Sequence, residues 1–289
     1  MKRLSYLILL SLLLQGHFYF SQMPESDIWL FKLKTNKQKQ VVITDSLNFT
    51  HRKGYDNQPS FSADEKKIYY VSVREDQQAD IYVYQIKQKK IVQLTKTKES
   101  EYSPQLNADG HFLSAVTVEK DSSQKIHILD AINGAYIKSF NFDSVGYYQY
   151  LNKDTIIYYK LTEPHSLRMQ VLRTAEDQKI CDKPIRGFKT INRSQLLYGI
   201  KDSTKVNYYI YDFLLNKAIY YTSFLSTNED ALWHPTLGLM KSEGAKILRY
   251  NAPKKEWTVY LDLSIYKVKK ITRFLFDSQN KYLIIVNNP

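Results

Sequence analysis

A unit of about 45 residues recurs along this chain, and this repetition constrains the fold more than any other feature. Residues 59–68 (PSFSADEKKI) match residues 104–113 (PQLNADGHFL) in outline. The second position of successive units falls at residues 62, 107, 152, 192, 234 and 277. Six units of this kind predict a repeat architecture, in which each unit buries its apolar face against its neighbours.

Each unit contains short apolar segments separated by Asp, Asn, Gly and Lys. The first unit offers strands at 68–73, 81–86 and 91–94, and the second at 112–118, 126–129 and 135–140. These segments are rich in Tyr, Ile and Val, and none of them shows helical periodicity. The sequence therefore predicts an all-β, six-bladed β-propeller with four-stranded blades.

The two ends of the chain look like two halves of one blade. Residues 27–33 (DIWLFKL) resemble 80–84 (DIYVY), and 40–44 resemble 91–95, whereas the last unit has room only for a strand at 282–286. We therefore predict that the last blade is closed by strands from both termini, so that ladder hydrogen bonds tie the ends together.

The N-terminus reads as a secretory signal peptide. Met1, Lys2 and Arg3 precede an apolar run at 4–14 that is too short to span a bilayer. We predict a signal peptide at 1–21 and a propeller domain at 22–289, located in the periplasm or secreted, with no transmembrane segment after cleavage. An uncleaved N-terminal anchor is the alternative, because only Ser21 supplies a small residue at the cleavage site.

The net charge and the cysteine content limit which partners and which covalent cross-links we expect. The formal net charge is +12, but the lysines are scattered in ones and twos beside turns, so we expect solvated loops and no nucleic-acid partner. The single Cys181 cannot form an intramolecular disulfide and is expected to be a small buried group.

Three segments of the chain resemble one known family. Residues 80–84 (DIYVY), 93–95 (QLT) and 104–110 (PQLNADG) look like the repeat of TolB-type propellers. The resemblance is good for the first two units and for 27–44, and outline-level after about residue 150. It implies an exported, non-enzymatic binding or scaffold module of the cell envelope that recognises a protein or peptide, here as the propeller alone.

Catalytic signals are sparse. The sequence has no Gly-x-Ser-x-Gly, no phosphate loop and no His or Cys pair at zinc spacing, so we expect no cofactor and favour a non-enzyme. Glu229, Asp230 and His234 form the only suggestive cluster, and a satisfied turn histidine is the favoured interpretation. Two alternatives stay open: a channel-metal lyase or lactonase acting on a polysaccharide or lactone, and a surface that recognises an anionic glycan.

Propeller geometry predicts where a ligand would bind. Connections into each first strand lie on the same face as those between second and third strands, and mixed aromatic and charged residues there suit a protein, peptide or glycan. The candidate rim comprises His51, Arg52, Tyr55, Asp56, Glu101, Tyr102, Tyr147, Tyr148, Arg186, Phe188, Glu229 and Asp230.

Overall fold

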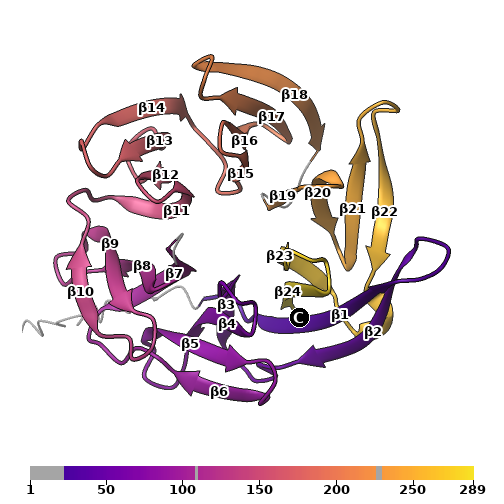
Figure 1. Cartoon of the computed structure of the whole chain (residues 1–289), viewed down its shortest axis with the longest axis horizontal. Helices are drawn as coiled ribbons and strands as arrows, with labels where there is room; N and C mark the ends of the chain where they lie inside the picture. The colour runs from indigo at the N-terminus through magenta and orange to yellow at the C-terminus, as the bar shows by residue number, and fades with distance from the viewer. Residues whose placement is uncertain (1–22, 108–109, 226–229) are drawn as a thin grey trace, which may run out of the picture.

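Six four-stranded antiparallel sheets stand around a central axis in the computed structural model (Figure 1). It describes residues 23–107, 110–225 and 230–289. The regular elements of the described residues are all β-strands except for one 3-10 turn, η1 (Ser264–Tyr266). The predicted all-β, six-bladed propeller is therefore confirmed. The predicted signal peptide lies outside the described residues.

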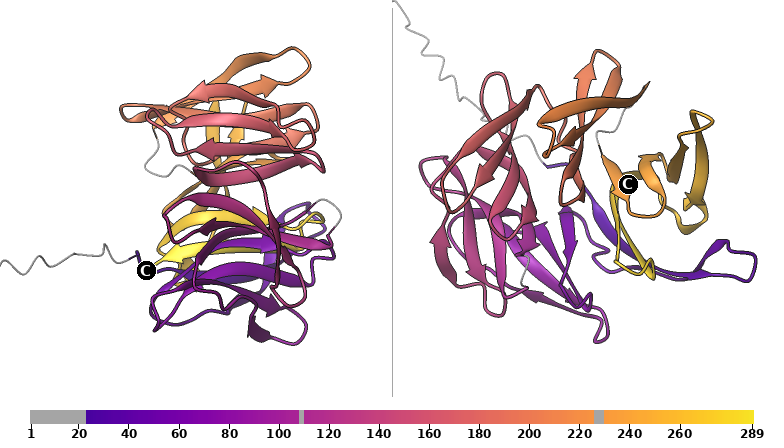
Figure 2. Two further views of the ribbon diagram at one scale, coloured as in Figure 1. Left: turned by 90° about the vertical axis from the view of Figure 1, so that its left-hand side faces the viewer. Right: turned by 45° about the horizontal axis from the view of Figure 1, so that its top comes forward.

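Each blade runs from an innermost strand beside the axis to an outermost strand at the rim (Figure 1), and from the side the strands run roughly along the axis of the ring (Figure 2). Blade 1 comprises β3 (Tyr55–Phe61), β4 (Lys67–Val73), β5 (Ala79–Gln85) and β6 (Lys90–Gln93). Blade 2 comprises β7 (Ser100–Leu106), β8 (Phe112–Val118), β9 (Gln124–Asp130) and β10 (Tyr136–Ser139). Blade 3 comprises β11 (Val145–Asn152), β12 (Thr155–Lys160), β13 (Ser166–Val171) and β14 (Asp177–Asp182).

The remaining blades repeat this order. Blade 4 comprises β15 (Lys189–Asn192), β16 (Gln195–Asp202), β17 (Lys205–Asp212) and β18 (Lys217–Leu225). Blade 5 comprises β19 (Ala231–His234), β20 (Gly238–Glu243), β21 (Lys246–Asn251) and β22 (Glu256–Asp262). Blade 6 comprises β23 (Lys270–Phe276), β24 (Tyr282–Asn288), β1 (Asp27–Thr35) and β2 (Val41–Asn48).

Blade 6 joins the two ends of the chain, as the sequence predicts. Its strand order is β2-β1-β24-β23, and β1 pairs with β24 from Asp27 opposite Asn287 to Lys32 opposite Tyr282. Because β24 lies between β23 and β1, its four central residues, 283–286, are completely buried. The hydrogen bonds between β1 and β24 therefore close the ring non-covalently and tie the two ends of the chain together.

The apolar core is divided among the gaps between blades. The described residues form six clusters, and each contains side chains from two neighbouring blades. Between blades 6 and 1, for example, Ile28 and Ile284 pack with Ile68 and Tyr70. The alternating apolar residues of the second and third strands point into these gaps, so the core holds neighbouring blades together. The axis is therefore lined mainly by side chains outside this core.

Among the described residues, no helix is long and apolar enough to cross a membrane.

Candidate functional site

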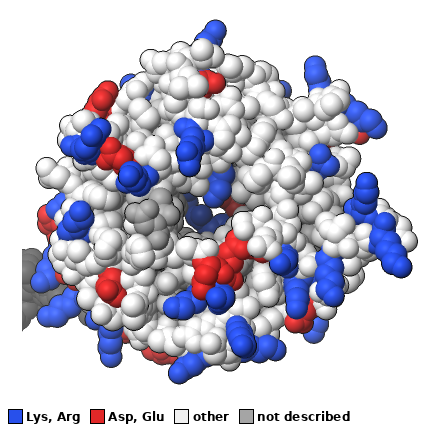
Figure 3. All heavy atoms as spheres, in the orientation of Figure 1, with Lys and Arg blue, Asp and Glu red and all other residues white. Residues whose placement is uncertain are grey.

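The axis of the ring contains a cavity of about 380 Å³ lined by the innermost strands. Its walls include polar and charged side chains from several blades, among them Gln105, Arg186, Lys189, Asp230 and Arg273. A view down the axis shows a central opening with cationic side chains deep inside it (Figure 3). A concave site with a few converging polar groups is the default candidate for ligand binding in a protein.

Polar side chains of the innermost strands connect one blade to the next around this cavity. The contacts are Gln58 Oε1 with the Ser103 N–H (2.6 Å), Gln105 Nε2–H with the Tyr148 carbonyl (2.6 Å), Gln149 Oε1 with the Thr190 N–H (2.7 Å), and Asp230 Oδ2 with the Phe274 N–H (3.3 Å). Each contact spans between 41 and 45 residues, which is one repeat. These bonds satisfy backbone groups beside the channel and fix the spacing of the blades there.

An aromatic and cationic cluster lies in the channel wall. Tyr147 of β11 and Arg273 of β23 belong to blades 3 and 6, which stand opposite one another (Figure 1). The Arg273 guanidinium nevertheless lies 5.5 Å from the centroid of the Tyr147 ring, so it reaches across the axis. The guanidinium of Arg186, from the connection between β14 and β15, lies 5.9 Å from the same ring. Both contacts have cation–π geometry.

Tyr55 stands close to this cluster. Burial raises the pKa of Tyr55 to about 12, and the positive charge of Arg273 is the largest influence that opposes the rise, with Arg186 also opposing it. Tyr147 and Tyr102 act in the same direction as burial. The phenol is therefore neutral at physiological pH and can donate a hydrogen bond.

Lys189 and Asp230, which both line the cavity, influence each other electrostatically. Burial lowers the pKa of Lys189, and the carboxylate of Asp230 opposes that shift. Burial raises the pKa of Asp230, against the opposing effects of Arg273, the Phe274 N–H and Lys189. Each group therefore favours the charged form of the other. Both side chains are partly removed from water, at the inner edges of blades 4 and 5.

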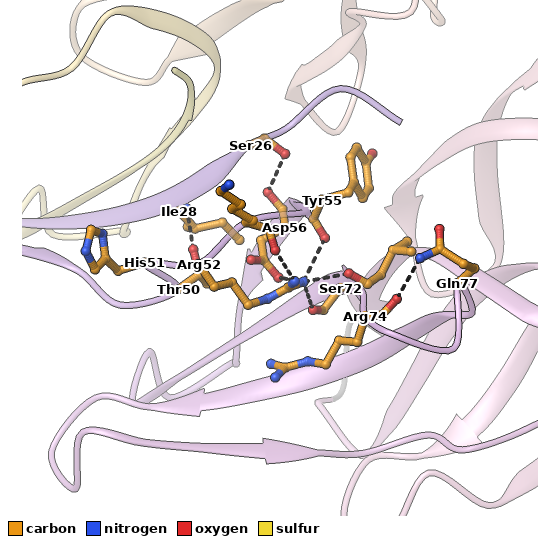
Figure 4. Close-up of polar contacts among 12 residues, drawn as sticks. Ser26, Ile28, Thr50, His51, Arg52, Tyr55, Asp56, Ser72, Arg74 and Gln77 are labelled. Carbon is orange, nitrogen blue, oxygen red and sulfur yellow. Dashed lines mark hydrogen bonds and ion pairs between the residues drawn. The ribbon is translucent and has the colours of Figure 1, made fainter. Parts of the chain in front are cut away.

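Arg52 and Asp56 form a second polar cluster, at the start of blade 1 (Figure 4). Arg52 Nη2 donates to Asp56 Oδ1 (3.0 Å), to Ser72 Oγ (2.7 Å) and to the Val73 carbonyl (2.7 Å). The Asp56 side chain is fully buried, and burial raises its pKa despite these contacts. Gly54 has φ +123°, and a Cβ there would lie 2.5 Å from Arg52 Nη1, so the chain needs glycine to let Arg52 fold back. This cluster anchors the connection from blade 6 to blade 1.

Glu101 occupies the corresponding position in blade 2. Asp56 and Glu101 each follow a threonine by six residues, and the threonine hydroxyl accepts a backbone N–H from the preceding blade, Ile28 for Thr50 and Ile81 for Thr95. Glu101 accepts hydrogen bonds from the hydroxyls of Thr95, at 3.0 Å, and Thr97. Burial raises the pKa of Glu101 to about 7.

The predicted rim residues separate into exposed and buried groups. His51 and Arg186 are exposed, and Arg52, Tyr55, Tyr102, Tyr147 and Asp230 are partly exposed. The side chains of Asp56, Glu101, Tyr148 and Phe188 are buried and present no binding surface. Glu229 lies outside the described residues. Ligand binding by the accessible members stays a prediction.

Six of the twelve predicted rim residues lie in strands, where the sequence analysis expected connections. Tyr55 and Asp56 open β3, Glu101 and Tyr102 lie in β7, and Tyr147 and Tyr148 lie in β11. These strands were missed because their residues, such as YDNQPSF in β3, lack the alternation of a half-buried strand. Because these strands line a channel, their side chains do not need to be apolar.

The same analysis missed several residues that line the channel. Gln58, Gln105, Gln149, Lys189 and Arg273 were not identified. A signal was available for the glutamines, because Gln58, Gln105 and Gln149 recur at nearly the repeat spacing within polar segments. Lys189 and Arg273 offered none, since their positions on the axis depend on ring closure.

His234 is a structural residue. It is buried, its Nε2–H donates to Asn280 Oδ1 at 2.6 Å, and its Nδ1 accepts the Thr236 and Leu237 N–H groups, each at 3.2 Å. The expected satisfied turn histidine is confirmed. Within the described ranges, no group of three His, Cys, Asp or Glu side chains is arranged to hold a metal ion.

Comparison with solved structures identifies the architecture. A TolB structure from Agrobacterium tumefaciens superposes with a TM-score of 0.67 at 7% identity, over 92% of this chain and 98% of the other. The fold is that of a TolB-like propeller. A chain of a nidogen–laminin complex matches with a TM-score of 0.59 at 8% identity, over 91% of this chain and 98% of that one.

The TolB-like fold is also shared with an enzyme. An oligogalacturonate lyase in complex with manganese superposes with a TM-score of 0.56 at 12% identity, over 89% of this chain and 82% of its own. No protein-family model and no curated protein matches the sequence. At these identities the likeness concerns the fold, and any function must be argued from the residues of this chain.

Proposed function

We propose that this TolB-like propeller is an exported, non-enzymatic binding module of the cell envelope that recognises a protein or peptide at its axial channel. The observation that carries the proposal is the cluster of Tyr55, Tyr102 and Tyr147 with two arginines at the channel wall. Tyrosine and arginine supply contact area and hydrogen bonds at modest entropic cost, and they are enriched where proteins bind partners.

The surroundings of the cluster support this assignment. The hydrogen bonds between innermost strands hold the backbone beside the channel, so the aromatic side chains project from a rigid frame. A cavity of about 380 Å³ lies near the small end of the range for ligand sites, about 300–1,000 Å³. It can accept one or two side chains of a partner, with the rest of that partner on the face of the ring.

A capture experiment tests the proposal. Wild-type protein and a Tyr55→Ala/Tyr102→Ala variant are immobilised and exposed to a cell-envelope extract of the source organism. Tyr136→Ala is the matched control, because Tyr136 is 59% exposed on β10, the outermost strand of blade 2. We expect a partner that wild type and the control retain and the double variant loses. Equal recovery by all three proteins would show that the aromatic cluster is the wrong surface.

The second candidate is a channel-metal enzyme of the lyase or lactonase type. The observation in its favour is the shared fold with a lyase in complex with manganese. Metal analysis after dialysis against Mn²⁺ distinguishes the two functions. Stoichiometric manganese that is lost in Asp230→Ala would favour the enzyme, because Asp230 is a carboxylate of the channel wall.

A further inference from the structure

We propose that Arg186 and Arg273 form a carboxylate-binding site inside the channel, and that the ligand of this propeller carries an acidic peptide side chain or C-terminus there. This inference rests on the proposed function, since it specifies the chemistry of the bound peptide. It is carried by the convergence of two guanidinium groups on one aromatic ring in a cavity.

Both arginines are attached to backbone that is fixed by packing and hydrogen bonds. The Ile185 N–H donates to the Gly199 carbonyl at 2.8 Å, and a Cβ on Gly199 would lie 2.8 Å from Ile185 Cδ1, so the segment before Arg186 packs directly on β16. Arg273 lies in β23 next to Phe274, which is buried and bonded to Asp230. The side chains therefore start from fixed points on opposite sides of the ring.

Among the described residues that line the cavity, three are cationic, Arg186, Lys189 and Arg273, and two are acidic, Glu65 and Asp230. Of the described residues, none places a carboxylate within 4 Å of the Arg186 or Arg273 guanidinium as an ion pair. Asp230 is the acidic group that interacts electrostatically with Arg273, but it also accepts the Phe274 N–H and faces Lys189. Glu65, which also lines the cavity, follows β3 at the end opposite Tyr55 and accepts the Ser278 N–H at 2.6 Å.

An anion bound beside Tyr147 would be attracted to both guanidiniums, which lie 5.9 Å and 5.5 Å from the centroid of that ring. A carboxylate suits the site best, because guanidinium donors form a planar fork that matches its two oxygens. The neutral phenol of Tyr55 adds a hydrogen-bond donor beside the arginines. Partial exclusion of water from the channel strengthens each of these interactions relative to the surface.

The test measures binding of a dye-labelled hexaglutamate peptide and its hexaglutamine counterpart by fluorescence anisotropy. The proteins are wild type, Arg186→Gln, Arg273→Gln and the matched control Arg173→Gln. Arg173 is a suitable control because it removes the same charge from a side chain that is 83% exposed in the turn between β13 and β14. Melting temperatures establish that all four proteins are folded.

We expect wild type and Arg173→Gln to bind hexaglutamate alike and to prefer it to hexaglutamine. Each channel variant should bind it at least about ten-fold more weakly, since a charged hydrogen-bonded contact is lost. Equal binding by all four proteins would overturn the site and leave only nonspecific attraction to a basic surface. A preference for trigalacturonate over hexaglutamate would overturn the peptide assignment.

These outcomes are separable from those of the capture experiment. If a partner is captured through Tyr55 and Tyr102 while hexaglutamate binding ignores both arginines, the proposed function stands and the carboxylate site falls. If hexaglutamate binding depends on the arginines but the tyrosine variant captures the same partners as wild type, the carboxylate site stands and the proposed protein-binding surface falls.

Discussion

Removal of the Arg52 side chain should destabilise the propeller more than removal of any other charged side chain near the surface. Arg52 is 22% exposed, Asp56 is fully buried, and the guanidinium also bonds Ser72 and the Val73 carbonyl. Arg52→Ala leaves the Asp56 carboxylate buried without its cation. Breaking a buried pair in this way costs about 3–5 kcal/mol.

The pH dependence of the variant gives a second, independent signature. Burial already raises the pKa of Asp56, and Arg52 is one of the groups that oppose this rise. Without Arg52 the folded protein should bind the Asp56 proton still more tightly than the unfolded chain does. The loss of stability should therefore be small below pH ~4 and should grow as the pH rises through the folded pKa.

Urea unfolding followed by tryptophan fluorescence at pH 7 and at pH 4.5 measures both effects. Arg52→Met/Asp56→Asn should recover a large part of the stability lost in Arg52→Ala, because no buried charge remains unpaired. Arg173→Ala is the control, since its ion pair with Asp154 is exposed and should contribute less than about 1 kcal/mol. A loss below about 1 kcal/mol in Arg52→Ala, with no dependence on pH, would refute this account.

Three further outcomes can be measured on the same protein. Burial raises the pKa of Glu101 to about 7, so the folded protein holds this proton more tightly than the unfolded chain and wild type should lose stability as the pH rises from about 4 to 7. Glu101→Gln should abolish this pH dependence, and melting temperatures of both proteins across this range check it. Ile285→Ala, in the fully buried centre of β24, should lower the free energy of unfolding by about 2–5 kcal/mol, whereas Val259→Ala, 55% exposed on β22, should change it by under about 1 kcal/mol in denaturant titrations. Cys181 should resist a thiol reagent at pH 8 until urea unfolds the chain, because burial raises its pKa to about 12; rapid labelling of the folded protein would contradict this.

Repetition and strand chemistry made most of the fold predictable. The 45-residue spacing between residues 62 and 107 implies one blade per unit, and the match of 27–33 to 80–84 identifies the strand that closes the ring. These signals are local, because a strand in the middle of a blade buries both faces and must be apolar whatever its neighbours are. The innermost strands were harder to predict, since they line a channel and carry few apolar residues.

The candidate site was predictable only in part. Tyr55, Tyr102, Tyr147 and Arg186 were recognised as residues of a channel mouth, but nothing in the sequence distinguishes Arg273 from other basic residues. Its role depends on contact with Tyr147, which is more than 100 residues away in the chain and on the opposite side of the ring.

The sequence by itself therefore determined the number of blades, their strand content and the pairing of the two ends, because periodic apolar residues dictate which segments become strands and which faces they bury. Only the tertiary structure decided which polar side chains meet on the axis. The blades are held together by apolar side chains packed between them. The polar residues at the centre become neighbours because the ring closes, and no local sequence pattern encodes those contacts.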